Sequence, residues 1–230
     1  MSWNWKAGGL PTINSDGNIT SIVSANQNAG FSIVKWTSSS TASDTIGSGL
    51  GKRVEFLITK KLNGPRDWHC WHKDLPNNGY LSLNTSDGES TPNGDRATVT
   101  NDNTFIAEST SGDSMIAYCF ASISGYQKVG SYEGTGGALT VYTTDDGSST
   151  GANGFQPSFV MIKRYTGGTG NWVIVDEARA SGGSRLYANL SNQEDTGQGE
   201  SFVSNGFKPR QSSTNDTNIS GSFYLYLAIK

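Results

Sequence analysis

The chain has 230 residues, a formal net charge of −3 at pH 7, 29 glycines and only 16% charged residues. This length suits one large all-β domain or two small ones. The sequence offers no basic stripe for nucleic acid, and no apolar run approaches the roughly 20 residues that span a membrane, so we expect neither partner. Short apolar runs between clusters of Gly, Ser, Thr, Asn and Asp predict many short strands joined by turns.

The chain opens with SWNWKAGG, in which Trp3 and Trp5 alternate as residues on one face of a strand do. The two rings could form an exposed sugar-binding platform. We favour a second interpretation, because the later stretch AYCFA has the same form, with Tyr118 and Phe120 in the places of the tryptophans. Residues 1–29 would then hold the closing strand of an earlier repeat, followed by a polar, glycine-rich linker.

From residue 30 onward the chain resembles itself at an offset of about a hundred residues, a period typical of a duplicated domain. Five pairs of stretches align in the same order: VEFLITKK (54–61) with SFVMIKRY (158–165), DWHCWH (67–72) with NWVIVD (171–176), YLSLNTS (80–86) with RLYANLS (185–191), NTFIA (103–107) with NGFKP (205–209), and MIAYCFA (115–121) with YLYLAIK (224–230). We therefore predict two tandem repeats, 30–124 and 125–230, with an all-β antiparallel sandwich or jelly-roll-like fold. One merged sandwich and two small domains both fit this pattern.

The aromatic residues of these strands are the expected structural core. Alternation places Phe56 with Val54 and Ile58 on one face, and it places Tyr118 with Phe120 on the face toward the core. The full set of expected core aromatics is Trp3, Trp5, Phe56, Trp68, Tyr118, Phe120, Phe159, Trp172 and Phe207. The two cysteines, Cys70 and Cys119, are too few for a disulfide scaffold, and we expect buried thiols, with a single disulfide as the alternative.

The stretch DWHCWHKD at 67–74 concentrates residues that bind metals or act as catalytic groups. His69 and His72 are three residues apart, so in a strand they point to opposite faces and cannot share a ligand. The aligned stretch of the second repeat carries Val-Ile-Val there, which indicates a structural position. We therefore predict no catalytic residue, no metal site and no cofactor.

Acidic residues cluster in three adjacent pairs, at 145–146, 176–177 and 194–195. Each pair lies in or beside a turn, where solvated carboxylates are ordinary, and we do not expect glycoside hydrolysis there. TTDDGSSTG and NTSDGES offer oxygens for calcium but lack the spacing of an EF-hand loop. The ligand-binding residues, if any, are not identifiable from the sequence.

Most of the chain resembles a repeat found in virion proteins of marine tailed phages of the cyanophage and pelagiphage kind. The stretches that carry the resemblance are WNWKA, GFSIVKWTS, GLGKRVEFLITKK, DWHCWH, GYLSLN, MIAYCFASISGYQKVGSYEGTG, NGFQPSFVMIKR and SNGFK. The chain departs from the family pattern in LNGPRDWHCWH, which is more polar, and at its start, where such repeats often follow a concanavalin-like or SPRY-like module.

The resemblance implies a non-enzymatic structural protein located in the virion, as a tail fibre, an appendage or a capsid decoration, with a role in host attachment. It implies other virion proteins as partners and a homo-oligomer, with a trimer favoured. A host-surface glycan is a further expected partner. The alternative is a carbohydrate-binding, lectin-like adhesin module, and a glycan-degrading enzyme is the least favoured of the three.

Overall fold

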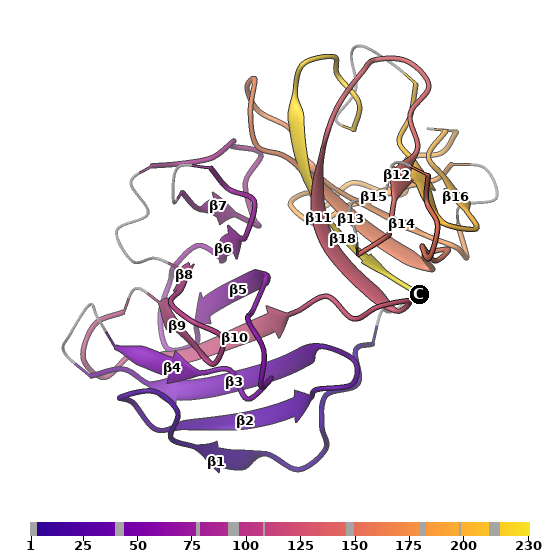
Figure 1. The fold of residues 1–230 in the computed structure, drawn as a ribbon. Coiled ribbons are helices and arrows are strands. Elements are labelled where there is room, and N and C mark those ends of the chain that lie inside the picture. The colour runs from indigo at the N-terminus through magenta and orange to yellow at the C-terminus, as the bar shows by residue number, and fades with distance from the viewer. Residues whose placement is uncertain are drawn as a thin grey trace. The chain divides into compact units, whose positions relative to one another are not determined.

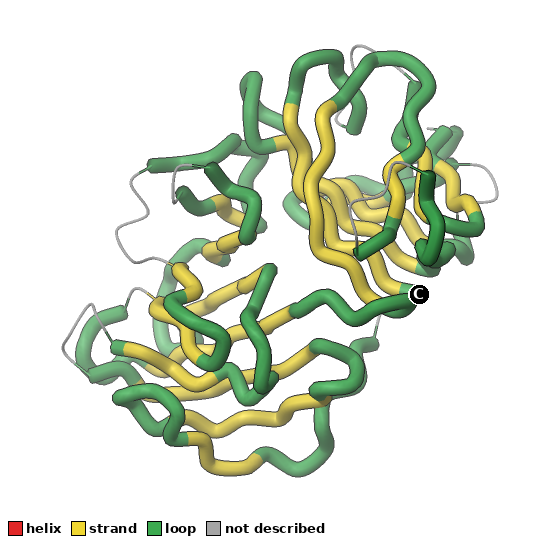
Figure 2. Tube along the Cα trace, viewed as in Figure 1, coloured by secondary structure: helices red, strands yellow, loops and turns green. Residues whose placement is uncertain are grey.

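The computed structural model describes residues 4–39, 44–76, 79–91, 97–107, 109–145, 150–179, 183–197, 199–211 and 217–230. These residues form strands and turns without a helix, which confirms the all-β prediction (Figure 2). No helix able to cross a membrane therefore occurs in these ranges. The chain divides into two compact units: unit 1 is Met1–Ser82 with Ser90–Ala121, and unit 2 is Leu83–Glu89 with Ser122–Lys230.

Unit 1 is a sandwich of a seven-stranded and a three-stranded antiparallel sheet (Figure 1). In order across the large sheet, its strands are β1 (Thr12–Asn14), β2 (Ser21–Asn26), β3 (Phe31–Thr37), β10 (Ser114–Phe120), β5 (Phe56–Lys61), β6 (His69–His72) and β7 (Leu81–Ser82). The small sheet holds β4 (Thr45–Gly47), β9 (Thr104–Ala107) and β8 (Ala97–Val99). Val34 and Leu57 of the large sheet and Phe105 of the small sheet belong to the apolar core between them.

Unit 2 is a sandwich of a five-stranded and a three-stranded antiparallel sheet. The large sheet holds β11 (Gln127–Glu133), β18 (Phe223–Ile229), β13 (Phe159–Arg164), β14 (Trp172–Asp176) and β15 (Leu186–Tyr187), in that order. The small sheet holds β12 (Val141–Tyr142), β17 (Gly206–Lys208) and β16 (Ser201–Val203). Val160 and Tyr226 of the large sheet pack with Phe207 of the small sheet in its core.

The two units share one strand order. The series β3-β10-β5-β6-β7 of unit 1 corresponds to β11-β18-β13-β14-β15 of unit 2, and β4-β9-β8 corresponds to β12-β17-β16. The registers agree as well, because Phe120 pairs with Phe56 where Ile229 pairs with Phe159, in line with the aligned sequence stretches. The tandem repeat and its origin by duplication stay predictions.

The polar part of residues 1–29, predicted as a linker, instead contains β1 and β2. These strands extend the large sheet of unit 1 beyond the five that unit 2 also has. The short run Ser21–Val23 suffices for a strand because Val23 is buried in the core, while Ile22, on the other face, is 49% exposed. The predicted boundary after residue 124 lies after Ala121 in the structure, and Leu83–Glu89 belongs to unit 2.

Tyr118 and Phe120 do not face the core between the two sheets of unit 1, although Phe120 is buried and Tyr118 is partly buried. Their neighbours Ala117 and Cys119 face it together with Leu57, so the predicted aromatics lie on the opposite face of the large sheet. Both faces of these strands are apolar, and alternation alone cannot say which face meets the small sheet. Phe56, Phe159, Trp172 and Phe207 are buried, and Trp68 is partly buried. Of these five residues, Phe207 belongs to a core cluster between a large and a small sheet.

The described part of the opening stretch, residues 4–9, forms no strand. Trp3 lies outside the described residues, and Trp5 lies in an irregular segment with 40% of its surface exposed. Its ring centroid is 6.4 Å from that of Phe31 and 6.3 Å from that of Phe120, so the ring contacts two aromatic residues of the large sheet. Trp5 is therefore a partly exposed residue that packs on unit 1 and not a core residue.

Candidate assembly site

The segment between β7 and β8 of unit 1 is part of unit 2. We call this segment, Leu83–Glu89, the docked loop. Its contacts with unit 2 include two backbone hydrogen bonds: the Ser86 carbonyl accepts from Gly170 N at 2.8 Å, and Glu89 N donates to the Tyr165 carbonyl at 3.0 Å. Unit 2 thus recognises the main chain of this segment.

Lys163, at the end of the apolar run of β13, holds the docked loop through a side-chain hydrogen bond. Its side chain is fully buried, and its Nζ donates to the carbonyls of Ser86, at 3.0 Å, and Gly170. The Nζ also lies 5.9 Å from the ring centroid of Trp172. A buried ammonium is costly unless hydrogen bonds replace its water, so the loop carbonyl stabilises the lysine as the lysine holds the loop.

A glycine allows the docked loop to come this close. A Cβ atom at Gly88 would lie 2.9 Å from the Tyr165 carbonyl oxygen and 3.3 Å from that of Gly168. Both contacts are tighter than ordinary packing, and both involve backbone atoms that cannot rotate away. Any other residue at position 88 would push the loop outward.

Unit 1 contains the same arrangement, which we call the unit 1 corner; it comprises Lys60, Lys61, Leu62, Arg66 and Trp68. Lys60 Nζ donates to the Arg66 carbonyl and lies 5.7 Å from the Trp68 ring centroid. Leu62 corresponds to Tyr165, because each donates its backbone N–H to the first residue of the neighbouring strand, β10 or β18. Leu62 is 50% exposed, whereas Tyr165 is 9% exposed, so the surface of unit 1 that corresponds to the one beneath the docked loop is exposed at this point.

Unit 2 contains a counterpart of the docked loop, residues 188–194, which we call the unit 2 loop. Both loops are closed by an isolated antiparallel bridge, Tyr80 with Ser90 in unit 1 and Arg185 with Asp195 in unit 2. Each bridge has two backbone hydrogen bonds of 2.9 to 3.0 Å. The tip of the unit 2 loop, residues 190–194, is exposed.

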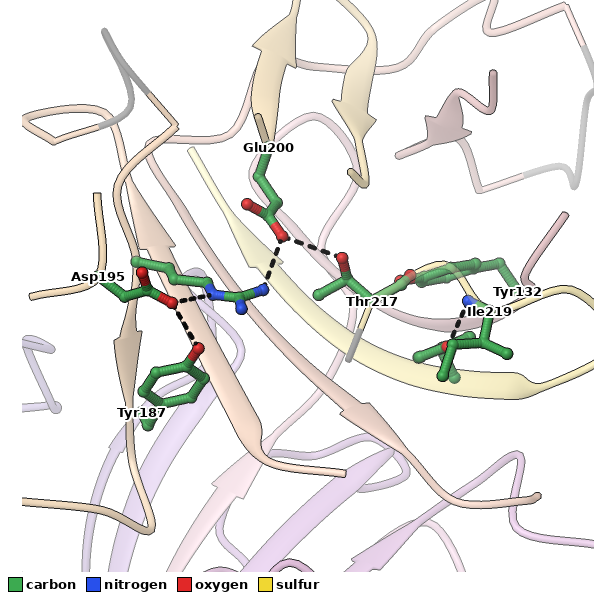
Figure 3. A network of polar contacts seen from close by, with 8 residues as sticks. Tyr132, Tyr187, Asp195, Glu200, Thr217 and Ile219 are labelled. Atoms are coloured by element: carbon green, nitrogen blue, oxygen red, sulfur yellow. Dashed lines mark hydrogen bonds and ion pairs between the residues drawn. The ribbon is translucent and has the colours of Figure 1, made fainter. Parts of the chain in front are cut away.

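A buried polar network holds the base of the unit 2 loop (Figure 3). Arg185 lies 3.3 Å from Asp195 through Nε and 3.3 Å from Glu200 through Nη1. Tyr187 donates its hydroxyl to Asp195 at 2.8 Å, and Thr217 donates to Glu200 at 2.9 Å. Burial alone would lower the pKa of Arg185, but the charge of Glu200, followed by those of its other acidic neighbours, raises the pKa overall. The guanidinium therefore stays charged.

The network continues to the large sheet of unit 2. Tyr132 donates its hydroxyl to the Thr217 carbonyl at 2.6 Å, and its ring stacks on that of Tyr224 with centroids 4.9 Å apart (Figure 3). The Tyr224 hydroxyl accepts from Ile219 N at 2.8 Å. Burial raises the pKa of Tyr132 well above its usual value, so this hydroxyl remains a donor.

A shallow hollow of about 360 Å³ runs beside the unit 2 loop. Its lining consists of Asn171, Tyr187, Leu190, Asn192, Gln193, Glu194 and Asp195. Asn171 is held by a 2.9 Å hydrogen bond from Asn189. Amides and carboxylates are groups that hydrogen-bond to hydroxyl-rich ligands.

The histidines of the predicted metal or catalytic stretch have structural surroundings. Both lie in β6, where His69 packs against Tyr80 with ring centroids 5.3 Å apart and His72 packs against Phe56 at 5.8 Å. Within the described part of the chain, no group of three or more His, Cys, Asp or Glu is placed to hold a metal ion. The stretch therefore contributes packing to the large sheet of unit 1.

Cys70 and Cys119 are buried free thiols, as the preferred interpretation predicts. Cys70 pairs opposite Ile58 and Cys119 opposite Leu57, so the two side chains point to opposite faces of the sheet and the alternative disulfide is wrong. Burial raises the pKa of the Cys119 thiol to about 12. This thiol is therefore unreactive at neutral pH.

The acidic pairs of the sequence are used in ion pairs. Asp145 lies 3.4 Å from Lys128, and Arg179 lies 3.0 Å from Asp176 and 3.5 Å from Glu194. Asp146 falls outside the described residues. The proposed calcium stretch NTSDGES coincides with the docked loop, where the Ser86 carbonyl meets an ammonium group.

Comparison with curated proteins gives no match, and comparison with solved structures gives none either. A family model matches the chain over residues 1–230.

Proposed function

The chain belongs to the family described as Domain of unknown function (DUF7483), and we propose that it is a non-enzymatic structural protein of a phage virion with a role in host attachment. The observation that carries the proposal is the docked loop, which is held by main-chain hydrogen bonds and a fully buried lysine. These polar groups join two distant parts of one chain, as a structural component that must stay folded in a particle requires.

The sequence resemblance to virion repeats supports the same function. Its most specific stretch, AYCFASISGYQKVGSYEGTG, runs from β10 through the junction after Ala121 into β11. The other specific stretch, GFQPSFVMIKR, runs into β13 and ends just after Lys163. The resemblance therefore falls on the framework and on the lysine that holds the docked loop.

Carbohydrate binding is the second candidate function, and the hollow beside the unit 2 loop favours it. The hollow combines amide and carboxylate groups with the ring of Tyr187, whose position is fixed by Asp195 and by the Arg185 guanidinium 5.2 Å from its centroid. Such a fixed set of hydrogen-bonding groups could bind a host-surface glycan in the course of attachment.

A glycan array tests this second candidate. If the hollow binds sugar, Asn192→Ala should remove the array signals, because Asn192 lines the hollow and is exposed. Asn28→Ala, at an exposed position in a different hollow of unit 1, is the matched control. Array signals that survive Asn192→Ala would exclude this hollow as the sugar-binding site. In a separate assay, cleavage products released from host polysaccharide by the protein would favour the glycan-degrading enzyme.

The principal proposal is tested on particles. We expect peptides of this chain in particles purified from a culture that produces it, and immunogold labelling at the particle surface with antibodies against the recombinant chain. Detection in infected cells together with absence from purified particles would contradict a structural role in the virion.

A further inference from the structure

We propose that two copies of the chain associate head to tail, with the unit 2 loop of one copy docked on the unit 1 corner of the other. This inference rests on the proposed structural function and deepens it by naming the contact. The docked loop supplies the template, since the chain already contains one such contact between Leu83–Glu89 and Lys163.

The unit 2 loop has the features of a donor. Its tip is exposed, with Leu190 41% accessible, while its base is fixed by the network around Arg185 and Asp195. It shares with the docked loop a serine at the position whose carbonyl meets the lysine, Ser191 in place of Ser86. A loop that is closed and fixed before contact loses little conformational entropy on docking.

The unit 1 corner has the features of an acceptor. Lys60 takes the place of Lys163 and has the same acceptor on its own unit, the carbonyl two residues before the tryptophan. Leu62 takes the place of Tyr165, and its side chain is half exposed. In the proposed contact Lys60 Nζ donates to the Ser191 carbonyl, and the loop covers Leu62.

The charges of the two surfaces are complementary. In the template, a loop with Asp87 and Glu89 meets a strand end with Lys163 and Arg164. The unit 1 corner holds three cations, Lys60, Lys61 and Arg66. Asp113 lies 2.7 Å from Lys61 and 3.9 Å from Arg66. In the proposed contact Glu194 of the incoming loop, which lies 3.5 Å from Arg179 of its own unit, approaches Lys60 and Lys61.

One residue of the unit 2 loop differs in a way that matters. Gln193 stands where the docked loop has Gly88, whose close contacts are the carbonyls of Tyr165 and Gly168. The turn that follows Leu62 is one residue shorter than its unit 2 counterpart, so the space taken by Gly168 is reduced. By the same reasoning, the proposed contact places the side chain of Gln193 against the Leu62 carbonyl, and removing this side chain should tighten the contact.

Such a contact uses two different surfaces and is therefore heterologous. Repeated around a closed rotation it gives a ring, and repeated without closure it gives a filament. The trimer predicted from the sequence resemblance is one of the closed forms.

Mixing two single-cysteine variants tests the contact between copies. Leu62→Cys and Gln193→Cys both change exposed side chains, and the native thiols are buried. Under mild oxidation the mixture should yield several-fold more disulfide-linked dimer than either variant alone, because only the mixture places the two cysteines together. An equal yield in the mixture and in the separate variants would overturn the proposal.

Two further variants and one geometric control complete the test. In sedimentation velocity, Gln193→Gly should raise the average mass at a given concentration and Lys60→Met should lower it. Thermal unfolding should be unchanged in Gln193→Gly and only slightly changed in Lys60→Met. The double variant carries both Leu62→Cys and Gln193→Cys. If it forms its disulfide only within one chain, the proposal is also overturned. None of these outcomes depends on whether the protein is found in virions, so this contact and the proposed function can fail separately.

Discussion

The docked loop and the unit 2 loop start from the same frame and are ordered by different means. Each is closed by an equivalent backbone bridge, but unit 1 has Tyr80 and Ser90 at the bridge where unit 2 has Arg185 and Asp195. Unit 1 builds no counterpart of the Arg185 ion pairs at this bridge, since neither of its two residues is charged. The docked loop receives its order from the surface it packs on.

This difference teaches where a loop obtains its stability. A loop that packs on a buried lysine can consist of small polar residues, because the lysine and the backbone beneath it form hydrogen bonds with the loop main chain. A loop with an exposed tip needs a fixed base, which the Arg185 network supplies. Each loop can be tested by removing the interactions that hold it in place.

The largest expected effect is on the network of unit 2. Glu200→Ala leaves the buried Arg185 without its closest buried carboxylate, and breaking a buried ion pair costs about 3–5 kcal/mol. Glu194→Ala, which removes a 39% exposed partner of Arg179, should cost less than about 1 kcal/mol. Urea unfolding of both variants measures the difference, and equal small losses would show that the network does not order the loop.

The next effect concerns the lysine under the docked loop. Lys163→Met leaves the carbonyls of Ser86 and Gly170 without their ammonium donor and should lower the free energy of unfolding by about 2–3 kcal/mol. Hydrogen exchange within Leu83–Glu89 should accelerate. Lys60→Met, at the half-buried counterpart, should cost less than about 1 kcal/mol, and a larger loss there than at Lys163 would reverse the comparison.

A smaller effect is expected from the glycine of the docked loop. Gly88→Ala places a Cβ against the Tyr165 carbonyl and should cost about 1–2 kcal/mol through overpacking. Limited proteolysis should then cut within Leu83–Glu89 more readily. The control is Gln193→Ala in the exposed unit 2 loop, and similar protease sensitivity in the two variants would mean that close approach is unimportant.

The smallest effect is a pH dependence confined to unit 1. The hydrogen bond from Lys61 holds the pKa of Asp113 below its usual value, with burial acting in the opposite direction. The unfolded state therefore binds the proton more readily, and the stability from this pair is present above about pH 4 and lost as the pH falls through the folded pKa. The stability gap between wild type and Asp113→Asn should shrink in acid, whereas a constant gap would contradict the ion pair.

Much of the strand framework could be predicted from the sequence. The alternating and apolar runs around Phe56, Phe105, Phe159 and Phe207 lie in strands, and the aligned offsets anticipated the shared strand order. The face that each large sheet turns to its small sheet could not be predicted. Both faces carry apolar residues, and the core side at β10 is marked only by the small residues Ala117 and Cys119.

The candidate site was not predictable in the same way. NTSDGES has the composition of any solvated turn, and unit 2 recognises its main-chain carbonyl, which is common to all residues. The available signal was Lys163, a lysine that continues the apolar run of β13 and ends up fully buried. A charge in such a run indicates a partner supplied from elsewhere in the chain.

The docked loop also sets an order of events during synthesis. Leu83–Glu89 leaves the ribosome well before Lys163 and Tyr165, the residues that bind it, have been translated. Strands β1 to β10 are complete once Phe120 is made, so the sandwich of unit 1 can form before Leu83–Glu89 has its binding partners. In the finished protein the C-terminal half of the chain holds this early segment in place. A nascent polypeptide stalled before residue 163 would therefore expose Leu83–Glu89 as a loop that a protease can cleave.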